Sequence, residues 1–278
     1  MQQIRMRYPG GKPKALTLSY ADGVEQDIRL VDIMRQHGIR GTFNLNSGLF
    51  APEGTVYAPG RIHRRLTEKA IVGLFRDSGQ EVAAHALTHP FLETLPAADV
   101  LQEVISDRQN LERLFDRPVH GMAYPYGTHN DAVVEALKLA GIHYARTTIS
   151  TTDFRQPTDW LRLTATCHHK NPALPELTRQ FTEEMPNRQP WLFYLWGHSY
   201  EFEGDGNWGV IEVFCRQAGG RADIWYATNI ELYDYTLAFN RLEYAVDGRM
   251  IHNPSARTVW ISRDGSDVEF PGGATVSL

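Results

Sequence analysis

Short apolar runs alternate along the chain with longer segments in which apolar residues recur at helical spacing. The first run, residues 16–23 (LTLSYADG), is typical of a buried strand that breaks at a glycine. A helical pattern follows over 27–37, and Gly38 suits a left-handed helix end. Further strands are expected at 41–46, 81–85, 121–125, 143–148, 191–198 and 224–228, with helices at about 67–79, 97–115, 131–139, 174–184, 210–218 and from 231 onward.

Strands separated by helices of this length indicate parallel βα units, and seven or eight such units favour an α/β barrel over an open sheet. The pattern changes near residue 242. Asp247-Gly248 and Asp264-Gly265 each lie between strand-like runs, which predicts tight hairpins. We therefore expect a barrel over residues 1–241 and a small antiparallel β extension over 242–278, packed on the barrel.

The composition is that of a soluble enzyme. Of the 278 residues, 42% are apolar and 22% charged, which is ordinary for a globular chain able to bury a sizeable core. The net charge of -5 argues against a nucleic-acid-binding protein, which usually carries a basic face. The basic stretch 61–65 (RIHRR) is interpreted as a solvated loop before a helix, with attraction of an anionic substrate as the alternative.

Other features of the sequence bear on the cellular location of the protein and on the redox state of its cysteines. Cys167 and Cys215 are far apart and follow no ligand spacing, so we expect two reduced thiols. The N-terminus shows no signal-peptide pattern, and the apolar run 191–196 is too short to span a bilayer. A cytoplasmic protein is expected, unless a signal was removed. The sequence does not indicate the oligomeric state.

Polar residues follow several of the predicted strands. Asp22 ends the first strand, and His85 and His89 follow another with four-residue spacing. In barrels of βα units, ligands bind beyond the carboxyl ends of the strands. Two histidines and one carboxylate with open coordination positions form a hydrolytic metal centre. The alternative is a capped loop with two surface histidines.

These residues belong to an ordered set of motifs: S-Y-A-D-G, H-A-L-T-H-P, A-Y-P-Y-G, D-W and W-G-H. The set resembles the five motifs of the polysaccharide deacetylases, carbohydrate esterase family four of the NodB-homology superfamily. The resemblance spans about residues 16–198 and implies a distorted (β/α)7 barrel. It also implies a divalent metal, zinc first with cobalt, nickel or iron as alternatives, held by Asp22, His85 and His89.

The resemblance assigns further roles. His198 matches the general acid that protonates the leaving group, and Asp159 matches the carboxylate that orients this histidine. Tyr126 matches the residue whose backbone N–H helps to form the oxyanion hole. Among candidate substrate-binding residues, Tyr20 and Trp196 are expected at the pocket. Trp208 would stack on a sugar ring or anchor the next helix.

Three positions depart from the family pattern. Position 21 is alanine where the family has the aspartate that takes the proton from water, and loss of a general base costs about 10²–10⁴ in rate. Position 123 is alanine where many members have an arginine that steadies this aspartate, and Trp196 replaces a common leucine. Glu25 or Asp27 could substitute as base, but both are expected at the exposed start of a helix.

We therefore expect a metal-dependent carbohydrate deacetylase that hydrolyses an N- or O-acetyl group through a metal-bound water, impaired by Ala21. Its partner would be an acetylated carbohydrate, with no nucleic acid and no membrane span. One alternative is an inactive carbohydrate-binding relative. The other is a hydrolase of non-peptide C–N bonds in small molecules. The adjacent His168 and His169 are open to structural or substrate-edge roles.

Overall fold

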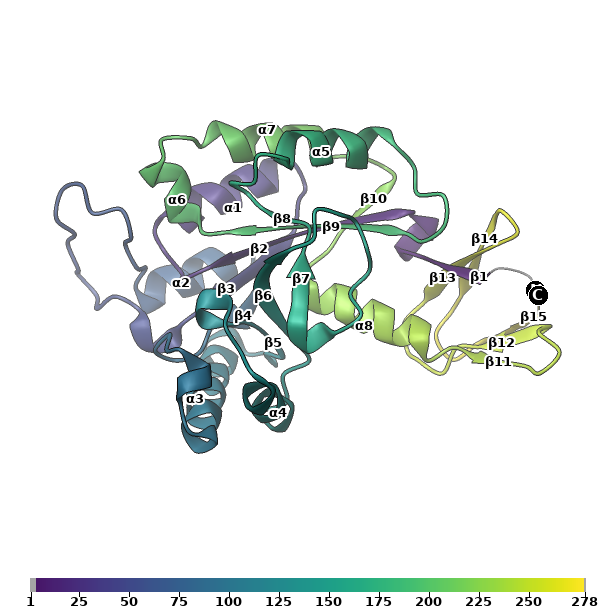
Figure 1. Cartoon of the computed structure of the whole chain (residues 1–278), viewed down its shortest axis with the longest axis horizontal. Helices are drawn as coiled ribbons and strands as arrows, with labels where there is room; N and C mark the ends of the chain where they lie inside the picture. Colours follow the sequence, from purple (N-terminus) through teal and green to yellow (C-terminus); the bar gives the residue numbers. More distant parts are fainter. Residues whose placement is uncertain (1–3, 278) are drawn as a thin grey trace.

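The centre of the molecule is a curved parallel sheet, seen in a computed structural model that describes residues 4–277. Hydrogen bonds connect eight of its strands in the order β7-β6-β5-β4-β3-β2-β9-β8, and β10 pairs with β2 (Figure 1). The strands are β2 (Lys14–Ala21), β3 (Gly41–Leu45), β4 (Glu81–Ala84), β5 (Gly121–Ala123), β6 (Tyr144–Ser150), β7 (Leu163–Ala165), β8 (Cys167–His168), β9 (Trp191–Gly197) and β10 (Ile224–Tyr226).

The sheet closes on itself through the segment 163–168. Its first part, β7, pairs with β6, and its second part, β8, pairs with β9. Between them, the Thr166 amide donates to the Tyr194 carbonyl at 2.9 Å. Strand β10 pairs with the beginning of β2, whereas β3 pairs with its end, which distorts the ring. The predicted α/β barrel is confirmed.

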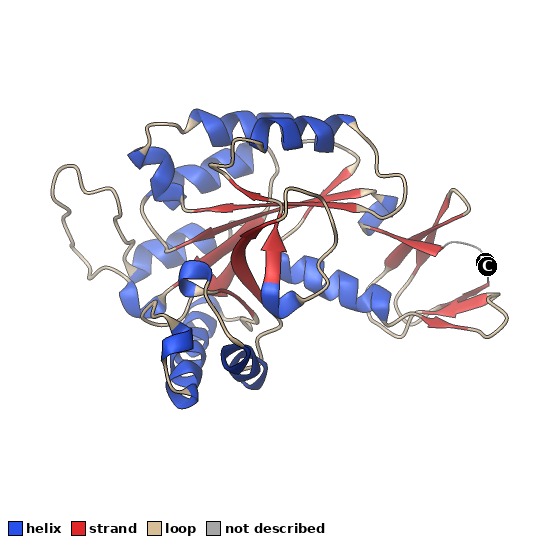
Figure 2. Cartoon of the chain, viewed as in Figure 1, coloured by secondary structure: helices blue, strands red, loops and turns tan. Residues whose placement is uncertain are grey.

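Helices surround this sheet, as Figure 2 shows in blue. They are α1 (Gln26–Gln36), α2 (Glu68–Phe75), α3 (Ala97–Phe115), α4 (Asp131–Leu139), α5 (Leu174–Glu183), α6 (Ser199–Gly204), α7 (Gly209–Ala218) and α8 (Asn229–Asn240). Side-chain caps set three of the starts: Thr67, Asn130 and Thr228 each accept from a backbone N–H three residues on. The short helix α6 was not predicted.

Strand β2 has two different faces, because successive side chains of a strand point to opposite sides. Leu16, Leu18 and Tyr20 belong to the core cluster that includes residues of α1. The other face is polar and points into the barrel, where Thr17 contacts Asn229 and Ser19 contacts residues of other strands. Ala21 continues this interior face at the end of the strand.

Small antiparallel sheets lie beyond α8, at the right of Figure 1. They contain β1 (Ile4–Arg7), β11 (Glu243–Tyr244), β12 (Met250–His252), β13 (Val259–Arg263), β14 (Ser266–Phe270) and β15 (Thr275–Ser277). Asp264 and Gly265 form the two-residue turn of the β13–β14 hairpin, with φ of 49° and 88°. The predicted antiparallel character is confirmed, but β1, which pairs with β13, was missed.

Two further expectations concern single features. Cys167 and Cys215 are both buried and free, as expected. Among residues 4–277, none of the helices has the length and apolar character that crossing a bilayer requires.

Candidate metal centre

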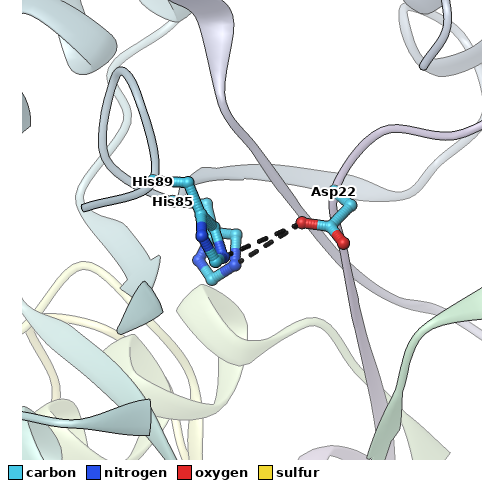
Figure 3. Close-up of side chains that lie close together, drawn as sticks. All are labelled: Asp22, His85 and His89. Atoms are coloured by element: carbon cyan, nitrogen blue, oxygen red, sulfur yellow. Dashed lines mark ion pairs between the residues drawn. The ribbon is translucent and has the colours of Figure 1, made fainter. Parts of the chain in front are cut away.

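The three predicted ligands come together at the carboxyl ends of the strands. The Asp22 Oδ1 atom lies 3.9 Å from His85 Nε2 and 4.0 Å from His89 Nε2. Figure 3 shows both imidazoles turned toward this carboxylate. Ligand atoms bound tetrahedrally at about 2.0–2.1 Å lie about 3.3 Å apart, so the spacing is slightly wider than an ion would require.

The imidazoles are in the form that binds a metal. His85 Nδ1 lies 2.8 Å from the Ala123 carbonyl, so this nitrogen carries the proton and Nε2 keeps its lone pair. Burial lowers the pKa of His85 to about 3 and also lowers that of His89, which keeps both rings neutral. A carboxylate with two neutral imidazoles fits a divalent transition metal ion.

The backbone at this centre is strained. Seven non-glycine residues in the described chain have positive φ, and four of them are at the site: Asp22 (90°), Ala86 (60°), His89 (59°) and Tyr126 (58°). Such conformations persist where the surrounding structure enforces them, often at functional sites. The segment 85–89 is a loop and not a helical turn, although four-residue spacing alone would also suit a helix. Residues in the left-handed conformation, rather than helical spacing, bring the His85 and His89 rings together, with their centroids 4.7 Å apart.

The loop 51–67 supplies two basic residues to the centre. His63 Nε2 lies 3.2 Å from Asp22 Oδ2, and Arg65 Nη2 lies 3.4 Å from Asp22 Oδ1. Burial opposes the charge on Asp22, but the hydrogen bond with His63 and the nearby His85 and Arg65 hold its pKa below the ordinary value. The segment 61–65 is a loop before α2, as expected, but His63 and Arg65 are partly buried against Asp22 and are not simply solvated.

A second group of polar side chains surrounds His198. Its Nδ1 lies 3.4 Å from Glu201 Oε2, and the same oxygen lies 3.1 Å from His168 Nε2 and 3.3 Å from His169 Nε2. Lys170 Nζ approaches the other oxygen of Glu201 at 3.1 Å. Burial opposes ionisation of Glu201, but hydrogen bonds from His168 and His198 hold its pKa below the ordinary value.

His168, His198 and Glu201 have the spacing of metal ligands, but the tautomer of His168 argues against that role. Its Nδ1 accepts a hydrogen bond from the Lys170 backbone N–H at 3.1 Å, so Nε2 carries the proton and donates to Glu201. This arrangement is the reverse of the one at His85. The group is therefore a hydrogen-bonded cluster that orients His198.

The structure does not bring Asp159 to His198. Asp159 is half exposed and caps the short 3₁₀ helix η5 (Trp160–Arg162), accepting from the Leu161 and Arg162 amides. Its second oxygen binds the Arg162 guanidinium at 2.9 Å. The predicted pairing of Asp159 with His198 is wrong, because local capping uses this carboxylate and Glu201 lies beside His198 instead.

A buried cation, Arg146, contacts Ser19, which lies two residues before Ala21 on the same strand. Arg146 on β6 lies opposite Ala123 in the strand register, and its Nε donates to Ser19 Oγ at 3.1 Å. Its guanidinium also lies 4.7 Å from the Trp196 ring. No carboxylate within residues 4–277 lies within 4.0 Å of it, and burial lowers its pKa. Arg146 therefore places a buried guanidinium on the strand next to the one that carries Ala123.

Neither proposed substitute for the base is free. Asp27 is fully buried, accepting from Ser199 Oγ at 2.6 Å and from the Val24 amide at 3.1 Å, and burial raises its pKa to about 7. Glu25 pairs with Arg64 at 2.5 Å. The expectation that Asp27 is exposed is wrong, because its side chain links the turn after Asp22 to the start of α6.

The residues predicted to bind substrate differ in whether they lie at the site. Tyr20 is fully buried on the helix-facing side of β2 and stacks on His169, so its prediction as a pocket residue is wrong. Trp208 packs on Phe202 and under the Arg29 guanidinium, which matches the anchoring alternative.

The other two aromatic residues lie at the centre. Trp196 is 8% exposed and lies edge-on to His168 at 4.4 Å, so little of its surface is open to a ligand. Tyr126 is 52% exposed, and its ring contacts His89 at 4.5 Å.

A family model described as polysaccharide deacetylase matches residues 8–145, about half of the chain. The matched segment contains Asp22, His85 and His89. The chain belongs to the polysaccharide deacetylase family. A search of curated proteins found no match.

Solved structures share the fold of this chain at low identity. A candidate polysaccharide deacetylase from Mycobacterium smegmatis is 14% identical with a TM-score of 0.58, over 86% of this chain and 96% of that one. A family 4 carbohydrate esterase from Streptomyces lividans, in complex with acetate, is 17% identical with a TM-score of 0.51, over 77% and 91%. A family 4 pseudoenzyme from Bacillus anthracis is 18% identical with a TM-score of 0.50, over 83% and 68%.

Several residues of the candidate site were missed from the sequence. Glu201 had a local signal, since it follows His198 by three residues at a helix start. His63 and Arg65 were noted only as a basic run. Arg146 had no signal, because a lone arginine in a strand looks like any surface cation until the register places it inside a barrel.

Proposed function

We propose that this chain is a metal-dependent carbohydrate deacetylase, impaired by the absence of a base at position 21. The observation that carries the proposal is the convergence of Asp22, His85 and His89, with both imidazoles neutral. Family membership supports a hydrolytic reaction on an acylated carbohydrate. The substrate is an acetylated sugar, and the bond cleaved is its N- or O-acetyl bond.

Asp22, His85 and His89 hold the divalent ion, for which zinc is the first candidate. When bound, such an ion lowers the pKa of a coordinated water and polarises an acyl oxygen. Asp107 supports this set, because it accepts from the His85 amide at 2.9 Å and fixes the loop behind the ligands.

His198 handles the proton of the leaving group. Glu201 holds its Nδ1, which leaves Nε2 to donate a proton as the bond to the acyl carbon breaks. The products are acetate and the free amine or hydroxyl of the sugar. The Tyr126 backbone N–H is assigned to the acyl oxygen, where a fixed donor would stabilise developing negative charge.

The missing element is the proton acceptor for the attacking water. Ala21 offers no base, and Asp27 and Glu25 are bound elsewhere. Ala21→Asp is therefore expected to raise the rate of acetate release by about 10²–10⁴. A mutant of the family 4 pseudoenzyme with restored enzymatic activity has been solved, so a protein of this fold can regain activity by mutation.

The experiment measures acetate release from N-acetylglucosamine oligomers and acetylated xylo-oligosaccharides, by the chain and by Ala21→Asp, with and without chelator. Ala21→Asn is the matched control, because it has similar size without a basic carboxylate. Deacetylation by Ala21→Asp alone, abolished by chelator, is the expected result. If Ala21→Asp and Ala21→Asn are equally inert on every substrate, the deacetylase proposal is wrong.

The second candidate is a carbohydrate-binding relative without turnover, which Ala21 itself favours. It predicts that the chain binds acetylated sugars and that Ala21→Asp adds no activity. Hydrolysis of small cyclic amides is the third candidate, and the same assay with ring amides as substrates separates it.

A further inference from the structure

Two exposed aromatic rings lie beside the metal centre. Phe91 is 46% exposed and Tyr126 is 52% exposed. Their rings are stacked, with centroids 3.9 Å apart and planes inclined by 11°. Tyr126 in turn contacts the His89 ring at 4.5 Å. The pair therefore forms a continuous apolar surface that begins at a metal ligand.

The backbone that carries each ring is fixed by local contacts. Phe91 follows Pro90 and precedes the 3₁₀ helix η3 (Leu92–Thr94), whose Leu92 is fully buried. The Phe91 carbonyl accepts from both the backbone N–H and the hydroxyl of Thr94, at 3.0 and 2.7 Å. This loop fixes the backbone of Phe91 while its ring stays in contact with water.

Tyr126 is fixed by its own backbone. It has a φ of 58° within the turn η4 (Pro125–Gly127), and Gly127 has a φ of 78°. A Cβ on Gly127 would lie 2.3 Å from the Thr148 side chain, so the chain passes too close for any other residue. A strained turn that presents an exposed ring at an active site is suited to ligand contact rather than to folding.

We propose that the Phe91–Tyr126 pair is a stacking platform for a pyranose ring of the substrate. The ring concerned is the sugar next to the one whose acetyl group lies at the metal centre. A pyranose presents C–H groups on its faces, which pack on an aromatic face while its hydroxyls remain hydrated. A preformed platform binds such a ring with little loss of side-chain entropy. The proposal rests on the proposed function for the position of the acetylated sugar.

The test is binding of the N-acetylglucosamine tetramer and monomer to the chain, measured by calorimetry for Phe91→Ala, Phe91→Tyr and Leu139→Ala. Leu139 is 78% exposed at the end of α4 and is the matched control for loss of an exposed apolar side chain. Phe91→Ala should weaken tetramer binding about three- to tenfold, the effect of one aromatic contact. Phe91→Tyr, Leu139→Ala and monomer binding should stay near the original values.

Equal tetramer affinity for the chain and Phe91→Ala would overturn the platform, as would failure of the tetramer to bind the chain at all. Thermal unfolding of each variant shows whether the fold is kept. Acetate release by Ala21→Asp is a separate measurement that tests the deacetylase proposal. If sugar binds through Phe91 but Ala21→Asp is inert, the platform stands and the deacetylase proposal fails. If Ala21→Asp is active and Phe91→Ala changes neither affinity nor KM, the platform alone fails.

Discussion

At the residue scale, Arg146 bears on the proposed loss of a base at position 21. Its guanidinium is buried inside the barrel, contacts Ser19 and Trp196, and has no carboxylate partner among the described residues. Ser19 and Ala21 lie on the same face of β2, two residues apart. An aspartate at position 21 would therefore extend into the neighbourhood of this guanidinium and offset its buried charge.

A double-mutant cycle tests this pairing. In the chain with Ala21, Arg146→Met should raise the free energy of unfolding by about 1–4 kcal/mol, because it removes a buried charge that has no carboxylate in direct contact. In the Ala21→Asp background the same change should lower it by about 3–5 kcal/mol, because it leaves the new carboxylate buried alone. Urea unfolding with chelator present gives both values without contributions from bound metal.

The sign of the coupling decides the outcome. If Arg146→Met has the same effect in both backgrounds, within about 0.5 kcal/mol, Ala21 and Arg146 do not interact and the pairing is wrong. Ser19→Ala in each background is the control for loss of the neighbouring hydrogen bond.

Single residues could be recognised from the sequence where a motif is local. Asp22 precedes a glycine, and His85 and His89 belong to one five-residue segment, so their residue types and order could be recognised without the fold. Glu201 was missed in favour of Asp159, because either acid could reach His198 until the chain path is known. The tautomer of His168 depends on a backbone N–H two residues away, which no residue pattern encodes.

At the scale of elements, Glu81 connects four parts of the barrel. It begins β4 and accepts hydrogen bonds from Thr42 on β3 (2.8 Å), Tyr144 on β6 (2.7 Å) and the Ile230 amide at the start of α8 (3.0 Å). Burial raises the pKa of Glu81 despite these donors. The folded protein therefore keeps a proton that the unfolded chain releases.

The stability of the fold should depend on pH through this residue. The contribution of protonated Glu81 is fully present below the unfolded pKa of about 4.3 and is lost as pH rises through the raised folded pKa. A carboxyl group whose pKa is one pH unit higher in the folded than in the unfolded chain contributes about 1.4 kcal/mol at low pH. Glu81→Gln keeps a neutral side chain of similar shape and should remove this dependence.

Urea unfolding of the chain and Glu81→Gln from pH 4 to 8 measures the difference. The free energy of unfolding of the chain should fall relative to the variant as pH rises. Parallel curves for the two proteins would show that Glu81 titrates alike in both states. Glu135→Gln, an exposed glutamate on α4, is the control for loss of one surface charge.

The spacing of apolar residues predicted the longer helices well. The helices α3 and α4 were predicted with their observed limits, because long amphipathic segments bury one apolar stripe. Strand β1 was missed although Ile4 and Met6 alternate with arginines, since its partner β13 is more than two hundred residues away. Neither segment alone indicates that it pairs with the other.

At the scale of the whole molecule, the barrel is what makes one site from distant segments. Strand β2 pairs with β3 on one side and β9 on the other, so Asp22 and His198 leave the sheet from adjacent strands. The loop 51–67 then adds His63 and Arg65 from above the strand ends. Closure of the sheet at 163–168 places His168 next to Glu201, which completes the group around His198.

The central claim is that Asp22, His85 and His89 hold one metal ion together. Anomalous diffraction from crystals grown with zinc, collected on both sides of the zinc absorption edge, tests it most directly. The account predicts an anomalous peak within bonding distance of Asp22, His85 Nε2 and His89 Nε2, and no peak among His168, His198 and Glu201. Ordered side chains without a peak between the first three, or a peak only at the second group, would contradict it.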